Sequence, residues 1–274
     1  MTQAEKGLAF RALHQREGAF IIPNPWDVGT ARLLAQLGFE ALATTSAGFA
    51  FSVGLPDNAV GREAMIAHVR AIASATDLPV SGDLENGFGD APEILVETIS
   101  LAASAGLVGG SIEDATGRPH EPLYEKEFAA ERVRAAAEKA RSLPFQFTLT
   151  ARAENYLVGK PDLKDTIARL QAYQDAGADV LYAPGITKRE EIVSLVSAVD
   201  RPVNFLMGSA GVHFSQAELS AMGVKRISVG SGLSRAALGA FLRGAEEMKT
   251  KGTFSFSESA ASYKELNEIF RRQE

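Results

Sequence analysis

Short apolar runs that alternate with helical patterns are the feature of this chain that most restricts its fold. Between the runs, apolar residues recur at spacings of three and four, which is typical of helices packed on a sheet. Repeated strand–helix units with short connections indicate a parallel sheet, and eight such units in 274 residues predict a (β/α)8 barrel. The expected strands are residues 19–22, 41–44, 79–82, 107–112, 146–151, 179–183, 203–206 and 226–229.

Glycines mark the ends of several predicted helices. Gly38, Gly106, Gly177 and Gly223 each stand between the last apolar residues of a helix and the next strand. Glycine readily adopts the left-handed conformation that closes a helix, so these positions support the repeat. An open doubly wound sheet is the alternative, but no Gly-x-Gly-x-x-Gly follows the first strand. No linker composition divides the chain, and we expect one domain over residues 1–274.

Composition excludes several classes of protein. The net charge is -6 and the basic residues are scattered, so we expect neither nucleic acid nor an anionic membrane as a partner. No apolar run approaches membrane-spanning length, and residues 1–6 lack a signal-peptide pattern, which favours a cytoplasmic protein. The chain has no cysteine, and this excludes disulfides, thiolate metal sites and a cysteine nucleophile or acid.

Acidic pairs end two of the predicted strands. Asp83 and Glu85 follow the third strand at alternate positions, so their side chains point the same way. Glu113 and Asp114 end the fourth strand, and in a barrel all strand ends meet at one face. Oxygen ligands suit a hard divalent cation, so the two pairs together predict a Mg²⁺ site, with Mn²⁺ as a possible substitute. For one pair alone, solvated carboxylates that cap the following helices would be the better interpretation.

Other strand ends carry further candidate residues. Ser46, Ala47 and Gly48 follow the second strand and could present a hydroxyl and backbone N–H groups to a carboxylate or an oxyanion. An ordinary tight turn would explain the same residues. Trp26, the only tryptophan, follows the first strand and could form a wall of the pocket or pack in the core. Arg152 ends the fifth strand and is either a clamp for a substrate carboxylate or the ion-pair partner of a neighbouring glutamate.

The histidines and one long loop complete the inventory. His14 and His68 lie on helical patterns and are expected at the surface, whereas His213 follows the seventh strand and could approach the site. His120 lies in the stretch 115–126, which is rich in proline and glycine. A loop of this length at the mouth of a barrel is often a mobile lid, and a static surface loop is the alternative.

In their order along the chain, these motifs resemble the isocitrate lyase/phosphoenolpyruvate mutase superfamily from about residue 19 to the last helix. The resemblance implies a barrel that binds Mg²⁺ and a small 2-oxo acid and makes or breaks a C–C or C–P bond beside it. The motifs are Thr45-Ser46-Ala-Gly48, Leu55-Pro-Asp57, Asp83-Leu-Glu85-Asn-Gly-Phe-Gly89, Ile112-Glu113-Asp114 and Thr150-Ala-Arg152-Ala-Glu154.

The resemblance also implies a role for each candidate residue. Asp83 would contact the metal directly, while Glu85 and Glu113 would act mostly through its waters. Arg152 would hold the far end of the substrate or an intermediate, and Asp57 would border the pocket. The implied catalytic residues are Arg152, Asp57 and Glu113, and the implied substrate-binding residues are Ser46, Ala47, Gly48, Trp26, Asp83 and Arg152.

Departures from the family pattern restrict the reaction. Family lyases that cleave isocitrate or 2-methylisocitrate carry a cysteine motif on the loop after the fourth strand, and residues 115–126 have none. The motifs of the phosphonate-processing members have no match there either. Thr44 stands where the family pattern has an aromatic residue, and Glu85 stands where it has an aspartate. Residues 182–185 lack the histidine expected after the sixth strand. We therefore expect decarboxylation of an oxaloacetate-like substrate through an enolate. Retro-aldol cleavage, phosphonopyruvate mutase or hydrolase chemistry, and a 2-oxo acid binding protein without turnover are the alternatives.

The chain continues beyond the eighth repeat into a segment with its own apolar stripe. Ser255 and Glu258 form a capping-box pattern before an amphipathic helix. A stripe of this kind indicates a surface that packs against another element, and in the resembled family the last helices exchange between neighbouring barrels. We therefore expect a homo-oligomer, a dimer or a tetramer, with an exchanged helix at about residues 257–272. The stripe consists of Tyr263, Leu266, Ile269 and Phe270.

Overall fold

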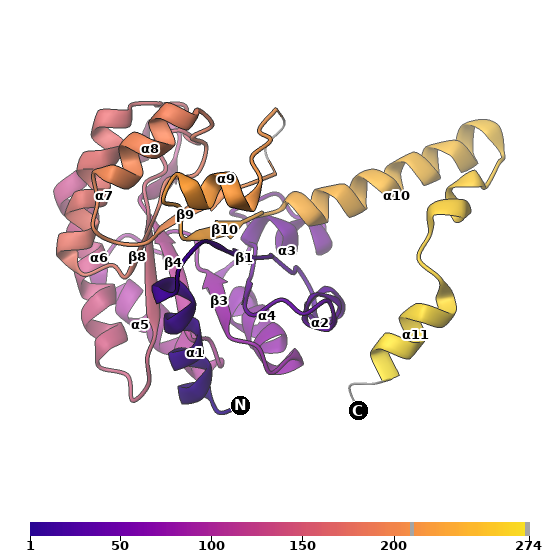
Figure 1. Ribbon diagram of the computed structural model, residues 1–274, viewed down its shortest axis with the longest axis horizontal. Coiled ribbons are helices and arrows are strands. Elements are labelled where there is room, and N and C mark those ends of the chain that lie inside the picture. The colour runs from indigo at the N-terminus through magenta and orange to yellow at the C-terminus, as the bar shows by residue number, and fades with distance from the viewer. Residues whose placement is uncertain (209–210, 272–274) are drawn as a thin grey trace.

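The computed structural model describes residues 1–208 and 211–271, and within them eight parallel strands form a nearly closed barrel (Figure 1). The strands are hydrogen-bonded in the order β1-β10-β9-β8-β7-β4-β3-β2, and the Ala43 N–H donates to the Pro23 carbonyl at 3.1 Å between the two ends of this sheet. The predicted (β/α)8 barrel is confirmed. The strands are β1 (Phe20–Ile22), β2 (Leu42–Ala43), β3 (Val80–Asp83), β4 (Gly109–Glu113), β7 (Thr148–Arg152), β8 (Val180–Tyr182), β9 (Val203–Leu206) and β10 (Arg226–Ser228).

Helices surround the barrel and follow the strands in the expected alternation (Figure 1). Gly38, Gly106, Gly177 and Gly223 have φ angles between +84° and +107°, which confirms the predicted left-handed helix ends. The helices are α1 (Gln3–Gln15), α2 (Val28–Gln36), α3 (Ser46–Ser52), α4 (Arg62–Ala75), α5 (Pro92–Ser104), α6 (Lys126–Arg141), α7 (Leu163–Ala176), α8 (Arg189–Ser197), α9 (Gln216–Ala221), α10 (Gly232–Lys251) and α11 (Tyr263–Arg271).

Two histidines expected at the surface are buried, so that prediction was wrong. His14 on α1 is 7% exposed and packs edge-on against Phe10 and Phe20 beside the barrel core. His68 on α4 is 8% exposed and stacks on Phe49 with 3.8 Å between ring centroids. Each histidine lies on the inner face of its helix, where the aromatic ring fills space like an apolar side chain.

The stretch after β4 is an antiparallel hairpin rather than an irregular loop. Its strands are β5 (Ala115–Arg118) and β6 (Glu121–Leu123), and exposed His120 lies at the turn between them. Arg118 forms an ion pair with Asp90 at 2.8 Å, and the Tyr124 hydroxyl donates to the same carboxylate at 2.6 Å. These contacts attach the hairpin to the loop after β3, and its movement as a lid remains a prediction.

A C-terminal arm extends beyond the barrel (Figure 1). Helix α10 projects outward, and the predicted helix at 257–272 is instead a 3-10 turn, η1 (Ser255–Ser259), followed by α11; residue 272 lies outside the described residues. Phe241 is 71% exposed and Tyr263 is 85% exposed. Phe270, by contrast, lies against α2: its Cζ atom would be 3.9 Å from a Cβ atom placed on Gly29 of that helix. Subunit exchange remains a prediction.

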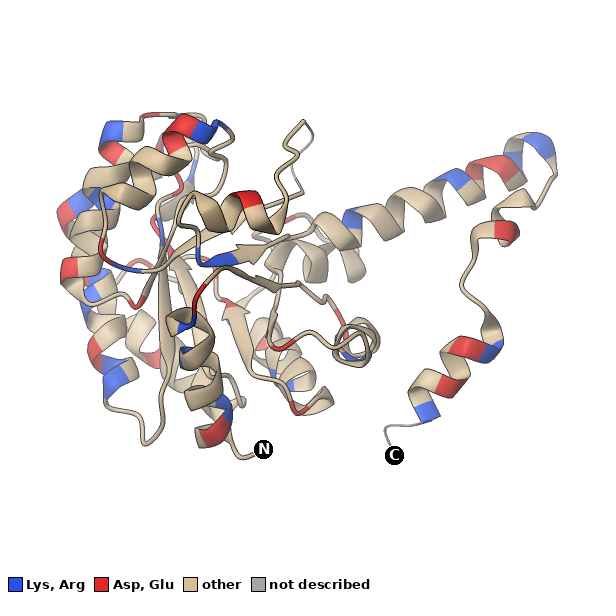
Figure 2. Ribbon diagram, viewed as in Figure 1, with Lys and Arg blue, Asp and Glu red and all other residues tan. Residues whose placement is uncertain are grey.

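The outer helices carry charges of both signs, interspersed along their length (Figure 2). Within residues 1–208 and 211–271, no helix combines the length and hydrophobicity needed to cross a bilayer.

Candidate active site

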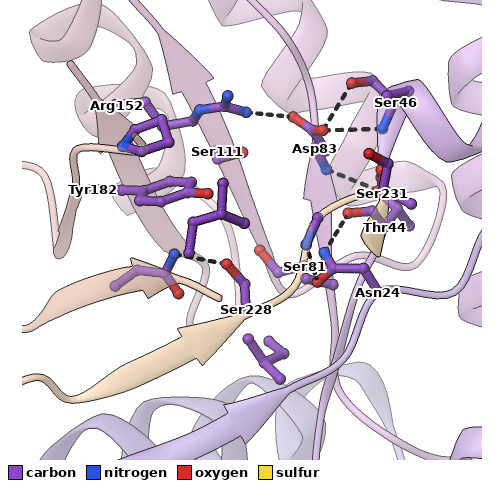
Figure 3. A pocket seen from close by; sticks show the side chains of 18 of the residues that line it. Asn24, Thr44, Ser46, Ser81, Asp83, Ser111, Arg152, Tyr182, Ser228 and Ser231 are labelled. Atoms are coloured by element: carbon purple, nitrogen blue, oxygen red, sulfur yellow. Dashed lines mark hydrogen bonds and ion pairs between the residues drawn. The ribbon is translucent and has the colours of Figure 1, made fainter. Parts of the chain in front are cut away.

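A cavity of about 160 Å³ opens at the carboxyl ends of the strands and continues into the barrel interior (Figure 3). Its outer wall includes Ser46, Asp83 and Arg152, and its inner wall includes Ser81 and Arg226. The size and polar lining of this cavity suit a compact, polar metabolite.

Asp83 joins the polar groups at this cavity. Its Oδ2 accepts hydrogen bonds from the Ser46 N–H at 3.0 Å and the Ser46 hydroxyl at 2.8 Å, and its own N–H donates to Thr44 Oγ1 at 2.8 Å. Its Oδ1 lies 2.9 Å from Arg152 Nη1. Figure 3 shows Ser46 and Arg152 approaching Asp83 from opposite sides. The structure thus brings together three residues that the sequence assigned to one site.

Arg152 is surrounded by carboxylates. Its Nη1, Nη2 and Nε atoms lie 2.9, 3.1 and 2.8 Å from oxygens of Asp83, Glu113 and Glu154, respectively. Its guanidinium carbon lies 5.2 Å from the centre of the Tyr182 ring. Burial disfavours the charge of Arg152, yet the carboxylates of Glu154, Glu113 and Asp83 raise its pKa well above the usual range. Both sequence interpretations therefore stay open, because the ion pairs are present and the side chain also lines the cavity.

Glu85 and Glu113 line an adjacent cavity of about 450 Å³, beneath the β5–β6 hairpin. Glu85 has φ +50°, a left-handed conformation that costs a non-glycine residue roughly 1–2 kcal/mol. Its Oε1 is buried without a hydrogen-bond partner among the described residues. Burial, followed by the charges of Asp83 and Asp57, raises the pKa of Glu85 to about 8. Burial also raises the pKa of Glu113 well above its usual range, although Arg152 opposes this.

Asp57 lies at the edge of the first cavity, as expected. Its Oδ1 accepts a hydrogen bond from the Asn58 N–H at 3.0 Å, and the Ser46 hydroxyl is 3.5 Å away. Burial and then the Asp83 carboxylate raise the pKa of Asp57. Among the described residues, Asp57 and Glu85 therefore add two carboxylates to the three that pair with Arg152.

This concentration of carboxyl groups suits a divalent cation, whose charge would favour their ionised forms. Among the described residues, no group of three or more His, Asp and Glu side chains is arranged to hold an ion by itself. Mg²⁺ usually keeps several waters and takes only one or two protein carboxylates, so such a group is not required. A cation held by Asp83, with Glu85 and Glu113 reached through water, would satisfy the orphaned Glu85 oxygen and relieve the mutual repulsion of the carboxylates.

The segment predicted to bind the substrate carboxylate begins a helix rather than a tight turn. The Thr45 side chain caps α3, and its hydroxyl accepts from the Gly48 N–H at 3.2 Å. Ser46 and Ala47 line the cavity, whereas Gly48 is buried behind them. Trp26 is half-buried beside Gly48 and lies outside the set of residues that line the cavity. Substrate contact by Gly48 and Trp26 remains a prediction.

Buried hydrogen bonds hold the strand ends in place. Asp114 accepts from the Tyr173 hydroxyl at 2.5 Å, from Arg169 at 3.1 Å and from the Glu154 N–H at 2.8 Å. Arg132 is 2% exposed and donates to the carbonyls of residues 86, 89, 90 and 113. These two residues fix the loop that contains Glu85 and the segment that contains Glu154, so the site depends on groups that never touch its cavity.

Polar side chains line the barrel interior, and the sequence motifs did not predict them. The alternation of side chains along a strand could have revealed this lining. Ser81 and Ser111 each stand two positions before an acidic residue at a strand end, so they point to the same side of the sheet. His213, by contrast, is exposed and lies outside the residues that line the cavity. The missed residues that line the interior are Ser81, Ser111, Asn204, Arg226 and Ser228.

Several known proteins are similar to this chain in sequence or fold. A protein from Burkholderia cenocepacia J2315, whose name places it among the lyases or mutases, has a crystal structure that is 63% identical, with a TM-score of 0.96 over 98% of this chain and 96% of that one. The 2-methylisocitrate lyase of Salmonella typhimurium is 32% identical over 69% of this chain and 65% of its own length. The oxaloacetate decarboxylase of a Bradyrhizobium species is 30% identical over 74% of this chain and 70% of its own length.

The family model described as phosphoenolpyruvate phosphomutase matches residues 10–249, which include every strand of the barrel. The motifs that suggested a resemblance all fall within this match. The chain therefore belongs to the phosphoenolpyruvate phosphomutase family, within the isocitrate lyase/phosphoenolpyruvate mutase superfamily.

Proposed function

We propose that this protein is a Mg²⁺-dependent lyase that breaks a carbon–carbon bond next to a 2-oxo acid, and that it decarboxylates an oxaloacetate-like substrate. The observation that carries the proposal is Asp83, which lines the cavity and contacts both Ser46 and Arg152. Two relatives at 30–32% identity are named for 2-methylisocitrate cleavage and oxaloacetate decarboxylation, which are both reactions of small acids.

Asp83 would hold Mg²⁺ or Mn²⁺ directly, and Glu85 and Glu113 would hold it through water. When bound, the cation polarises the 2-oxo group and stabilises negative charge on its oxygen. Ser46 orients the Asp83 carboxylate through two hydrogen bonds, and Thr44 fixes the backbone of Asp83. The chain thus presents a carboxylate whose direction is set before any ligand arrives.

The residues around Asp83 suit the charge changes of decarboxylation. The bond between C3 and the leaving carboxylate breaks, its electron pair passes to the 2-oxo oxygen through C2, and CO₂ departs. The enolate then takes a proton at C3 from water. Arg152 places a guanidinium 2.9 Å from Asp83, at the end of the cavity where we place the 2-oxo group. A preorganised cation at this position lowers the free energy of the developing enolate.

The absence of cysteine favours decarboxylation over isocitrate-type cleavage. The family reaction on isocitrate or 2-methylisocitrate uses a cysteine acid, and this sequence contains none. Loss of CO₂ needs metal and oxyanion support and little acid catalysis. The family description favours phosphonopyruvate chemistry as the second candidate, because the matched family is named for a phosphomutase. Binding of a 2-oxo acid without turnover is the remaining alternative.

A panel of substrates tests the proposal. Oxaloacetate, phosphonopyruvate and 2-methylisocitrate would be assayed with Mg²⁺ and with EDTA, and the uncatalysed metal-dependent loss of CO₂ would be subtracted. Activity on oxaloacetate should disappear in EDTA and in Asp83→Ala but persist in Glu63→Gln, which changes an exposed carboxylate on α4. Full activity in EDTA or in Asp83→Ala would refute the proposal. Turnover of phosphonopyruvate alone would establish the second candidate.

We further propose that the protein is a cytoplasmic homo-oligomer. The exposed apolar side chains of the C-terminal arm, among them Phe241 and Tyr263, support the oligomer.

A further inference from the structure

Arg226 is a buried cation at the inner wall of the cavity. It is 5% exposed, and its side chain crosses the barrel from β10 to β7. Its Nε donates to Asn204 Oδ1 at 2.9 Å, its Nη2 donates to Thr150 Oγ1 at 2.9 Å, and its Nη1 lies 3.5 Å from His14 Nε2. Asn204 and Thr150 carry no charge. His14 is also neutral at pH 7, because burial and the Arg226 charge lower its pKa to about 3.

The two arginines of the cavity differ in their charge balance. Each nitrogen of Arg152 faces a carboxylate, whereas no carboxylate among the described residues forms an ion pair with Arg226. Burial lowers the pKa of Arg226 to about 10, so the guanidinium is still charged at neutral pH. An uncompensated buried charge is costly, and an anion that enters the cavity would remove that cost.

Small hydroxyl side chains leave room for such an anion. The interior of a (β/α)8 barrel is normally filled by bulky branched residues. Here Ser81, Ser111 and Ser228 line the cavity at inward-facing positions. Figure 3 shows Ser81 and Ser228 on the side of the cavity away from Arg152. The inner part of the cavity is therefore open and rich in hydrogen-bond donors.

The inner wall lies within reach of a small acid bound at Asp83. Arg226 contacts Thr150, which precedes Arg152 by two residues on β7. Two residues along a strand span roughly 6.6 Å, so the Arg226 guanidinium lies about one layer of side chains below Arg152. In a five-carbon 2-oxo diacid, the two carboxylates are separated by a distance on the order of 5 Å. One ligand can therefore contact both levels.

We propose that Arg226, together with Ser81 and Ser228, forms a subsite for a second carboxylate of the substrate. The inference rests on the proposed function, which places the 2-oxo end of the substrate at Asp83. The planar guanidinium suits a carboxylate because it can donate two parallel hydrogen bonds. Such bonds oppose the loss of the bound group as CO₂, so the carboxylate held here is one that the substrate keeps. The substrate class is a 2-oxo acid with a retained carboxylate at the far end of its chain.

Two ligands of equal chain length test the subsite. The acid 2-oxoglutarate ends in a carboxylate, whereas 2-oxopentanoate ends in a methyl group, and neither has the arrangement that loses CO₂ in the proposed reaction. Calorimetric titrations with Mg²⁺ should show that the wild type binds 2-oxoglutarate about 10- to 100-fold more tightly, the range expected for a charge-assisted hydrogen bond. Equal binding of the two acids by the wild type would overturn the inference.

Variants locate the preference in the cavity. Arg226→Met should bind the two acids equally while retaining Mg²⁺-dependent binding of oxalate, a short ligand that reaches only Asp83. Ser81→Val, which narrows the proposed subsite itself without removing a hydrogen bond between described side chains, should weaken 2-oxoglutarate binding and spare oxalate. Unchanged selectivity in both variants would overturn the subsite.

The oxalate titration separates this inference from the proposed function. Failure of oxalate to bind with Mg²⁺, combined with Arg226-dependent selection of 2-oxoglutarate, would leave the subsite standing and refute the proposed function. Normal binding of oxalate without any selection between the two longer acids would refute the subsite alone. Failure of all three ligands would refute both.

Discussion

Arg152 Nη1 lies 2.9 Å from Asp83 Oδ1, and the two side chains are 13% and 17% exposed. The ion pair joins β7 to β3 across the intervening β4, whose terminal residue Glu113 contacts the same guanidinium at 3.1 Å. Asp83, the proposed metal ligand, therefore shares the positive charge of Arg152 with Glu113. Changes to either member of the pair should affect both the stability of the site and its binding of ligands.

Removal of the Arg152 charge should destabilise the fold. In Arg152→Met, the buried carboxylates of Glu113 and Glu154 lose their counterion, and we expect the free energy of unfolding to fall by about 3–5 kcal/mol. Urea denaturation at pH 7 measures this. Arg62→Met is the control, because the Arg62–Glu97 pair is more exposed and should contribute less than about 1 kcal/mol. Equal effects of the two substitutions would contradict the account.

Isocitrate and 2-methylisocitrate should be poor substrates. General acid catalysis typically contributes ~10²–10⁴-fold, and the chain has no cysteine to supply the acid that family members use for this cleavage. Glyoxylate or pyruvate release, followed with a coupled dehydrogenase, should be far below the enzyme median of about 10 s⁻¹. Turnover near that median on either compound would show that another group replaces the cysteine.

Stability should decrease in acid because His14 is buried as the neutral form. Burial, followed by the Arg226 charge, lowers its pKa from 6.5 to about 3. Between these values the unfolded chain binds a proton that the folded chain does not, so stability falls as pH decreases from about 6.5 towards 3. Because of His14, the free energy of unfolding should be about 2 kcal/mol lower at pH 5 than at pH 7.

Urea denaturation at the two pH values checks this for the wild type and His14→Asn. The variant should lose about 2 kcal/mol less between pH 7 and pH 5, whatever its stability at pH 7. His120→Asn, which changes an exposed histidine on the hairpin, should retain the wild-type pH dependence. An identical dependence in His14→Asn would contradict the burial of a neutral imidazole.

Deletion of the residues after Gly252 should disrupt assembly. The arm exposes Phe241, Leu242 and Tyr263, at 71%, 64% and 85%, and we expect a partner subunit to cover them. Light scattering of the full-length protein should show a dimer or a tetramer, and the truncated chain should yield monomers or aggregates. A full-length monomer at micromolar concentration would mean that α11 stays on its own barrel, where Phe270 already approaches Gly29.

The sequence predicted the barrel because its signals are local. Each predicted strand overlaps an observed one, and 203–206 coincides with β9, since short buried runs between glycine-closed helices leave little freedom. Buried His14 and His68 were misassigned because a polar side chain was expected at the surface, although the helical spacing places each of them on a buried apolar face. The hairpin after β4 was missed because its strands are short and interrupted by Gly117 and Pro122.

The site was predictable only where residues end strands. Asp83 and Arg152 follow apolar runs, so their shared location follows from the barrel itself. Arg226 begins a strand and gave no such signal, because only the three-dimensional structure shows that its side chain crosses to Thr150. The hydrogen bond from the Gly48 N–H to the Thr45 hydroxyl also could not be predicted from the sequence, since it depends on where α3 begins.

Binding of oxalate, a planar mimic of an enolate, tests the central claim most directly. Titration calorimetry would compare the wild type with Mg²⁺, the wild type with EDTA, and Asp83→Asn with Mg²⁺. The asparagine keeps the size of the side chain and one acceptor for Ser46, so the fold should be retained. We predict measurable binding for the wild type with Mg²⁺ and loss of binding in the other two cases. Equal oxalate binding in EDTA, or by Asp83→Asn, would contradict a metal-dependent 2-oxo acid site at Asp83.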